Sequence, residues 1–248
     1  MTEAEWLSAT DPAPMLDFLR GKASDRKLRL FTVGCCRRLW RYLDDKHWRP
    51  ALEAAEQCAD GELSVEELSA CWGDGRLMDD DFAARNGFSL QIVRAAFTTV
   101  WRSLHVTEKE KNTAAYVALI AGAQALGRKA DEFLLYHLHF RLVELDEEEH
   151  HKADLVVSAE KSVLAAFLRD IFGNPFRRTI NFKDTWRTNT VIALARQMYE
   201  NRDFSPMPIL ADALQDAGCD DEDVLSHCRG DGPHVRGCWV VDLLLGKK

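Results

Sequence analysis

The chain has 248 residues, of which 46% are apolar and 29% are charged, and its 40 acidic and 32 basic residues give a formal net charge of −8. This composition is that of a globular protein large enough to bury a substantial core, and it excludes a fibrous or globally disordered chain. The seven cysteines, an odd number in a chain of this length, argue against a secreted disulfide framework.

The N-terminal residues and the charge distribution bear on where the protein resides. The first seven residues, Met1-Thr-Glu-Ala-Glu-Trp-Leu7, are acidic and lack the apolar core of a secretory signal. The longest stretch without formal charge, residues 112–127, is shorter than the roughly 20 residues that a membrane span needs. We therefore expect a cytoplasmic protein with reduced thiols and no membrane association.

Helix signals dominate the first 72 residues. Asp11 followed by Pro12 predicts a helix start, and Ser24 predicts the N-cap of a second helix that runs to about Leu43. A third helix is expected over residues 50–59, and the pair Ser64 and Glu67 is a capping box that opens a fourth. The second helix has an apolar stripe of residues spaced three or four apart, namely Leu28, Phe31, Cys35, Leu39 and Tyr42.

The middle and the C-terminal part continue the helical pattern. Residues 73–87 are weakly patterned, and further helices are predicted within 89–101, 112–126 and 130–145. The acidic run at 146–154 is expected to be a solvated helix or loop, followed by a helix over 158–172. Later helices are predicted to start at Thr188, at Ser205-Pro206, at Asp220 or Asp221, and at Gly232-Pro233.

With about ten helices, short connections and no strand runs, the sequence predicts an all-α fold. Helix pairs of the Leu-Ala-Asp-Ala-Leu type resemble HEAT-like repeats only distantly, because no repeat returns with recognisable spacing. We therefore predict an irregular multi-helix domain. Its parts are an N-terminal helical part at 1–72, a helical middle at 73–157 and a C-terminal helical part at 158–248, packed as one compact unit.

The densest set of potential metal ligands lies near the C-terminus. Within 20 residues the chain places five thiol and imidazole side chains, namely Cys219, His227, Cys228, His234 and Cys238. Structural zinc binds four thiolate or imidazole ligands tetrahedrally, so this segment has enough donors for one site. Against zinc, the segment lacks the closely spaced cysteine pair that usually anchors such sites, and Cys219 and Cys238 also suit an apolar core. The other four cysteines are interpreted as core residues, namely Cys35, Cys36, Cys58 and Cys71.

A second candidate site is the polar face of the helix that follows Ser24. At 100° per residue, five basic side chains fall on the side opposite the apolar stripe, namely Arg26, Lys27, Arg37, Arg38 and Arg41. Such a face binds phosphates or an acidic partner in some proteins, and it is also typical of the solvated side of an amphipathic helix. The overall acidic charge makes a general nucleic-acid-binding surface the less favoured interpretation.

Several long motifs resemble a known family. They are Phe167-Leu-Arg-Asp-Ile-Phe-Gly-Asn-Pro-Phe-Arg177, Pro208-Ile-Leu-Ala-Asp-Ala-Leu-Gln-Asp-Ala-Gly-Cys219, His227-Cys-Arg-Gly230 and His234-Val-Arg-Gly-Cys-Trp-Val-Val-Asp-Leu-Leu-Leu-Gly-Lys247, with a matching N-terminus at residues 1–7, 15–22 and 24–31. Together they resemble a large paralogous family of uncharacterised planctomycete proteins. The resemblance implies no activity, cofactor or catalytic residue, and it marks the helical middle of the chain as the variable part.

No assembled catalytic motif is recognised in the sequence. It has no nucleophile elbow, Walker loop, dinucleotide fingerprint or His-Glu-x-x-His helix. We therefore name no catalytic residue and predict a protein-binding or scaffold module whose partner is another protein. The alternatives are a zinc-binding protein that uses the C-terminal Cys/His cluster and a nucleic-acid-binding protein that uses the Arg26–Arg41 face.

Overall fold

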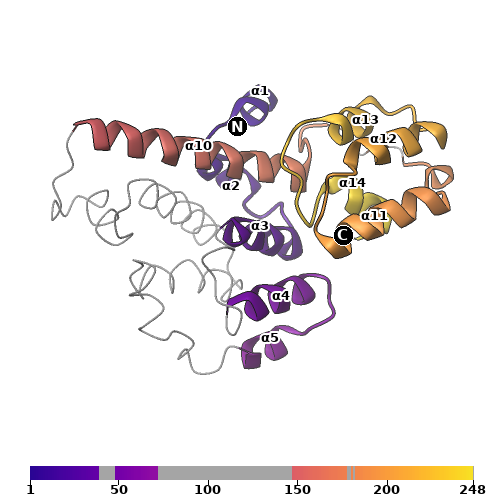
Figure 1. The fold of residues 1–248 in the computed structure, drawn as a ribbon, viewed down its shortest axis with the longest axis horizontal. Helices are drawn as coiled ribbons and strands as arrows, with labels where there is room; N and C mark the ends of the chain where they lie inside the picture. Colours follow the sequence, from indigo (N-terminus) through magenta and orange to yellow (C-terminus); the bar gives the residue numbers. More distant parts are fainter. Residues whose placement is uncertain (39–47, 72–146, 178–179, 181, 248) are drawn as a thin grey trace. The chain divides into compact units, whose positions relative to one another are not determined.

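The fold is that of a computed structural model, which describes residues 1–38, 48–71, 147–177, 180 and 182–247. These residues form ten α-helices and one short 3₁₀ helix, with no β-strand among them (Figure 1). The all-α class and the expected number of helices are thereby confirmed. No helix in these ranges is long and apolar enough to cross a membrane. The helices predicted between residues 89 and 145 lie outside the described residues.

The chain forms two compact units that are interleaved in sequence. Unit 1 comprises Met1 and Ala9–Ala165, and unit 2 comprises Thr2–Ser8 and Ala166–Lys248. The division falls inside α10 (Glu147–Phe172), which continues through it without a break. The boundary predicted between residues 157 and 158 also lies within α10, eight residues before this division.

Unit 1 is organised around the apolar stripe of its second helix. Its helices are α2 (Pro12–Leu19), α3 (Asp25–Arg37), α4 (Trp48–Ala59), α5 (Val65–Cys71) and the first part of α10. Leu28, Phe31 and Cys35 of the predicted stripe are buried, and α3 contacts α4. Leu39 and Tyr42 lie outside the described residues.

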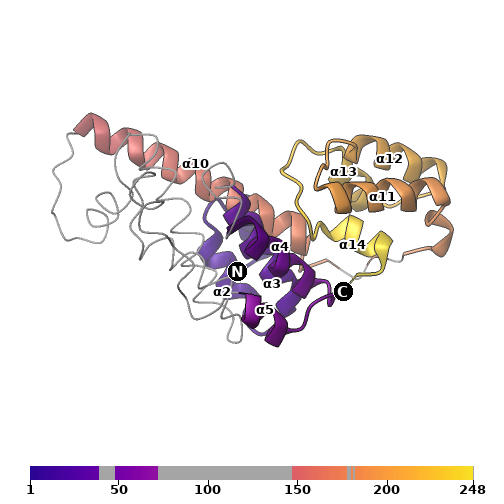
Figure 2. The same cartoon turned by 60° about the horizontal axis from the view of Figure 1, so that its bottom comes forward.

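Unit 2 is a small bundle around one apolar core. Its elements are α1 (Glu3–Ser8), the end of α10, the 3₁₀ helix η2 (Asp184–Trp186), α11 (Asn189–Asn201), α12 (Met207–Asp216), α13 (Glu222–Arg229) and α14 (Trp239–Leu245). α11 contacts α12 and α14, and α13 contacts the same two helices (Figure 2). All four helices bury apolar side chains in this core, among them Met198, Leu210, Val224 and Val241.

Several helix starts lie where the sequence predicts them. Ser64 and Glu67 form the capping box, because the Ser64 N–H donates to Glu67 Oε2 at 2.8 Å and the Glu67 N–H donates to Ser64 Oγ at 3.1 Å. Asp11, Ser24 and Thr188 each accept a hydrogen bond from a backbone N–H in the first turn of the helix that follows. These N-cap predictions are confirmed.

Two helix starts differ from the predictions. α12 begins at Met207 with Pro206 as its N-cap, and the preceding Ser205 N–H donates to Asp203 Oδ1 at 3.0 Å in a turn. α14 begins at Trp239 rather than at Pro233, because the intervening segment is held in an irregular conformation by contacts described below.

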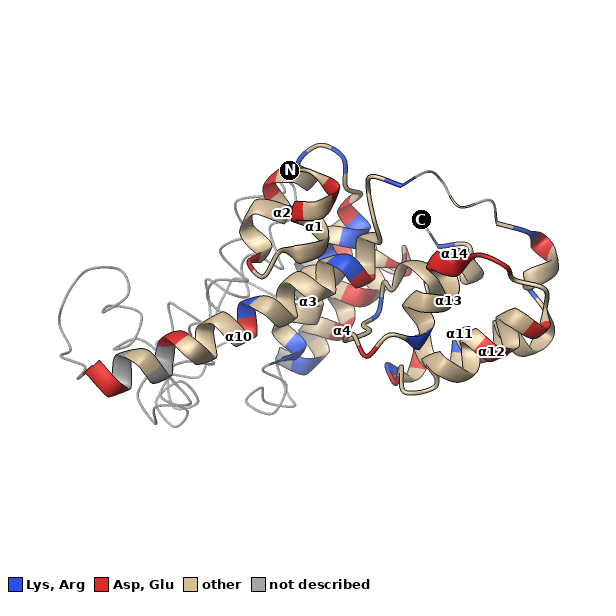
Figure 3. Cartoon of the chain, turned by 90° about the horizontal axis from the view of Figure 1, so that it is seen from above, with Lys and Arg blue, Asp and Glu red and all other residues tan. Residues whose placement is uncertain are grey.

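The acidic run before residue 158 belongs to a helix. α10 begins at Glu147, and the side chains of Glu147, Glu148, His151 and Asp154 are exposed. Figure 3 shows acidic residues at the start of α10. The prediction of a solvated segment is confirmed, and this segment joins the helix predicted over 158–172.

Of the two aspartates proposed to cap α13, the structure selects Asp221. Its Oδ1 accepts from the N–H groups of Asp223 and Val224 at 3.0 and 3.1 Å, whereas Asp220 is exposed and pairs with Lys183. Because α13 carries His227, one of the candidate metal ligands, this cap also supports the site described below.

We predict that Asp221→Ala lowers the free energy of unfolding by about 1 kcal/mol, because two amide groups of the first turn lose their acceptor. Asp220→Ala is the matched control, since it removes an exposed carboxylate that makes no cap, and we expect it to leave the melting temperature unchanged. Thermal and urea unfolding followed by circular dichroism measure both. Equal destabilisation by the two variants would contradict the assignment.

Candidate metal centre

Four side chains of unit 2 meet at the junction of α10, α13 and α14. They are Asp170, His227, His234 and Cys238, and one potential ligand atom of each lies within 4.8 Å of the other three. Within the described ranges this is the one group of three or more His, Cys, Asp or Glu side chains so arranged. It contains three of the five residues predicted as metal ligands and adds a carboxylate.

The carboxylate of Asp170 lies at the centre of the group. Its Oδ1 is 2.7 Å from Nδ1 of His234 and 3.2 Å from Nε2 of His227. Nε2 of His227 is in turn 3.2 Å from Sγ of Cys238. Asp170 is 3% exposed and Cys238 is fully buried, so the cluster is largely shielded from water.

The donors come from three parts of the chain. Asp170 lies in the last turn of α10, His227 lies near the end of α13, and Cys238 directly precedes α14. His234 lies in the irregular segment 230–238, which connects α13 to α14. The segment therefore carries two of the four donors and joins the helices on either side of them.

The irregular segment is held in place from two sides. The Val235 N–H donates to Asp170 Oδ2 at 2.8 Å, which ties the segment to α10 and directs the other carboxylate oxygen toward the two imidazoles. The Arg236 guanidinium lies 4.5 Å from the ring centre of Tyr199 on α11, a cation–π contact. A helix that began at Pro233 would move the Val235 N–H and the Arg236 side chain away from Asp170 and Tyr199. These two contacts explain why α14 starts later than predicted.

Hydrogen bonds alone satisfy this cluster poorly. Nε2 of His227 faces both Oδ1 of Asp170 and Sγ of Cys238, and a single N–H cannot make linear bonds to both. A cation bound between the four donors would give the carboxylate, the thiolate and both imidazoles one common partner.

A bound cation would also change the electrostatics of the cluster. Burial and the neighbouring Asp170 carboxylate raise the pKa of Cys238 well above its usual value. For Asp170, burial raises the pKa, but hydrogen bonds from His227 and His234 outweigh it and hold the pKa below its usual value. A divalent cation would neutralise one carboxylate and one thiolate, which leaves a buried site without net charge.

Three of the separations between donor atoms are close to those around a small tetrahedral ion, and all four donor atoms lie within 4.8 Å of one another. Zinc–ligand distances of 2.0–2.3 Å imply ligand separations of about 3.3 Å between nitrogen and oxygen and about 3.6 Å between nitrogen and sulfur. The observed separations of 2.7 and 3.2 Å are shorter by about 0.1–0.6 Å, a difference that small side-chain rotations supply. The donor set of two imidazoles, a carboxylate and a thiolate is typical of zinc.

The remaining two predicted ligands, Cys219 and Cys228, are not in the cluster. Both are buried in the apolar core of unit 2, where burial raises the pKa of Cys219 and brings that of Cys228 to about 12. Cys228 directly follows His227 on α13, and adjacent helical residues diverge by 100°. Its side chain therefore joins the core while that of His227 joins the cluster.

The sequence analysis missed Asp170 because it sought only cysteine and histidine. One signal was present: a carboxylate in the last turn of a helix opposes the helix dipole, so an Asp there is unfavourable without a partner. The residue also lies beside the apolar stripe formed by Leu164, Phe167 and Leu168. Asp170 and His227 are 57 positions apart in the sequence, so no local spacing connects them.

The basic face of α3 is used largely inside unit 1. Arg38 forms a two-pronged ion pair with Glu160, with both nitrogen–oxygen distances at 2.8 Å. Arg37 Nε is 2.7 Å from Glu56 Oε1, and Arg26 Nη2 is 3.2 Å from Asp60 Oδ1. Arg41 lies outside the described residues.

These carboxylates neutralise three of the five basic side chains that the nucleic-acid hypothesis invokes. Figure 3 marks the acidic residues in red and the basic residues in blue along the chain. The charge that remains is a weak basis for phosphate binding, which depends on several unneutralised cations.

Of the cysteines predicted to be core residues, Cys35, Cys36 and Cys58 are buried, and the side chain of Cys71 lies outside the described residues.

Comparison with family models, with curated proteins and with solved structures gives no match to this chain. The resemblance to planctomycete proteins therefore stays a prediction.

We predict that Arg38→Ala lowers the free energy of unfolding by about 1–2 kcal/mol, because the largely buried Glu160 carboxylate loses two charged hydrogen bonds. Arg20→Ala is the control, since Arg20 forms an exposed pair with Asp17 and should contribute less than about 0.5 kcal/mol. Urea unfolding gives both values. If Arg38→Ala were no more destabilising than Arg20→Ala, the ion pair would not be a structural element of unit 1.

Proposed function

We propose that unit 2 is a zinc-binding helical module in which Asp170, His227, His234 and Cys238 hold one Zn²⁺. The observation that carries the proposal is the convergence of these four donors from separate segments of the chain on one buried point. Asp170 would bind through Oδ1, because Val235 already engages Oδ2. His227 would bind through Nε2, the ring nitrogen that faces both the Asp170 carboxylate and the Cys238 sulfur.

The proposed role of the zinc is structural. Four protein donors complete a tetrahedral shell, whereas catalytic zinc sites keep a position for water or substrate. The exposed fractions of His227 and His234, 17% and 9%, leave little access to the centre. The ion would hold the irregular segment 230–238 and the end of α10 against α13 and α14, and it would stabilise the bundle as structural zinc does in small domains.

The prediction of a protein-binding module remains compatible with this role, since many structural zinc modules present a surface to a partner. The large exposed apolar side chains of the described residues are spread over different elements, such as Leu155 on α10 and Ile209 on α12. We therefore assign no partner surface.

The test is the zinc content of the full chain purified without added metal. We expect about one zinc per chain by inductively coupled plasma mass spectrometry, removal of the ion by a strong chelator, and a lower melting temperature after removal. Replacing zinc by Co²⁺ should give the absorption of a tetrahedral site together with a thiolate charge-transfer band. Less than about 0.2 equivalents of zinc would contradict the proposal.

Matched variants assign the ligands. Cys238→Ser and His227→Ala should weaken zinc binding by more than the roughly 10- to 100-fold typical of outer-shell changes, and Cys238→Ser should abolish the Co²⁺ thiolate band. Cys219→Ala and Cys228→Ala are the controls, since both cysteines are buried nearby but outside the cluster. Full zinc binding by Cys238→Ser, or loss of the thiolate band in Cys228→Ala, would contradict the assignment.

A further inference from the structure

The short helix α1 is held by the same elements that carry the metal ligands. It has six residues and lies more than 160 positions before the segment that it contacts. A helix of this length is not stable by itself in water, so its order depends on its docking site. Trp6 is fully buried, and its indole Nε1 donates to the Gly173 carbonyl oxygen at 3.0 Å.

The docking site of α1 is the end of α10 and the turn that follows. The Arg169 guanidinium donates to the Trp6 carbonyl oxygen at 3.3 Å, and Asn174 donates to the Glu3 carboxylate. Arg169 directly precedes the metal-ligand candidate Asp170 in sequence. Movement of the last turn of α10 would therefore act on both the cluster and the receptor for Trp6.

The Trp239 ring links this turn to the cluster. Gly173 has a φ of +63° and lies against Trp239, since a Cβ at this position would be 3.3 Å from the indole ring. The ring of Trp239 lies 5.1 Å from that of His227, centre to centre. Trp6, Gly173, Trp239 and His227 thus form a continuous chain of contacts from α1 to a proposed metal ligand.

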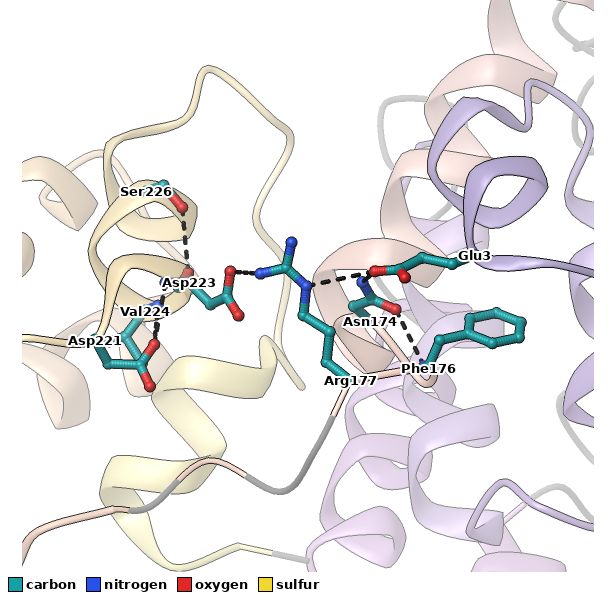
Figure 4. A network of polar contacts seen from close by, with 8 residues as sticks. All are labelled: Glu3, Asn174, Phe176, Arg177, Asp221, Asp223, Val224 and Ser226. Atoms are coloured by element: carbon teal, nitrogen blue, oxygen red, sulfur yellow. Dashed lines mark hydrogen bonds and ion pairs between the residues drawn. The ribbon is translucent and has the colours of Figure 1, made fainter.

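Arg177 forms a second connection between α1 and the cluster. Figure 4 shows Arg177 between Glu3 of α1 and Asp223 of α13. Asp223 lies one helical turn before His227 on α13. α1 is consequently connected to α10 and α13, which carry Asp170 and His227. Through Gly173 and Trp239 it is also connected to α14, which directly follows Cys238.

We propose that occupancy of the metal cluster controls the docking of α1: zinc fixes the receptor and holds residues 2–8 in unit 2, and removal of zinc releases them. This inference rests on the proposed zinc site. Because linkage is reciprocal, docking of α1 must strengthen zinc binding by the same factor, although α1 contributes no ligand. Released, α1 would expose the Trp6 side chain to a partner or a protease.

The first test is hydrogen–deuterium exchange on the full chain with zinc bound and after chelation, with zinc content measured on the same samples. We expect peptides covering residues 2–8 to lose protection without zinc, while α3 in unit 1 serves as the internal reference. If zinc binds and its removal leaves α1 protected, the coupling is refuted and the zinc site stands. If the chain binds no zinc, both proposals fail.

The second test measures the reciprocal effect by competition with a chromophoric zinc chelator. Trp6→Ala should weaken zinc binding by roughly 5- to 150-fold, the usual range of coupling between two sites. Trp6→Phe, which keeps an apolar ring but loses the bond to Gly173, should weaken it less and guards against misfolding of the alanine variant. Leu7→Ala is the control, because Leu7 is half exposed on the same helix. Zinc affinities of both Trp6 variants equal to that of Leu7→Ala would overturn the proposal.

Discussion

The burial of the Asp170 carboxylate is the constraint on which the organisation of unit 2 depends. A charged group removed from water must be compensated by hydrogen bonds, opposite charge or a metal, since isolated burial is very costly. Here one oxygen faces two imidazoles and the other accepts an N–H from the irregular segment before α14. These contacts determine where α14 can begin and bring three helices to one point.

The end of α10, which carries Asp170, also explains how remote parts of the chain belong to one unit. Residues 2–8 and residues 166–248 form unit 2, although unit 1 lies between them in sequence. The end of α10 has a double role, because it supplies Asp170 to the cluster and the Gly173 carbonyl to Trp6. A metal at the cluster would thus act on the connection between the two ends of the chain as well as on its own ligands.

Unit 1 shows a different use of charge. Its α3 helix has an apolar stripe and a basic face, and Arg38, Arg37 and Arg26 form ion pairs with carboxylates from α10, from α4 and from the turn after α4. The basic face is therefore part of the internal structure of the unit. A helical wheel places basic residues on one face, but it does not show whether acidic partners or water lie opposite that face.

The sequence by itself determined the all-α class, the N-caps at Asp11, Ser24 and Thr188, the capping box at Ser64, and the burial of Leu28, Phe31 and Cys35 on α3. Each of these depends on neighbours within a few positions, where spacing and side-chain chemistry are sufficient. It also indicated His227, His234 and Cys238, because they lie close together in sequence. Only the tertiary structure brought in Asp170, separated Cys219 and Cys228 from the cluster, and joined α1 to unit 2. These relations arise from packing between segments that are distant along the chain, and local periodicity carries no information about which distant segments meet.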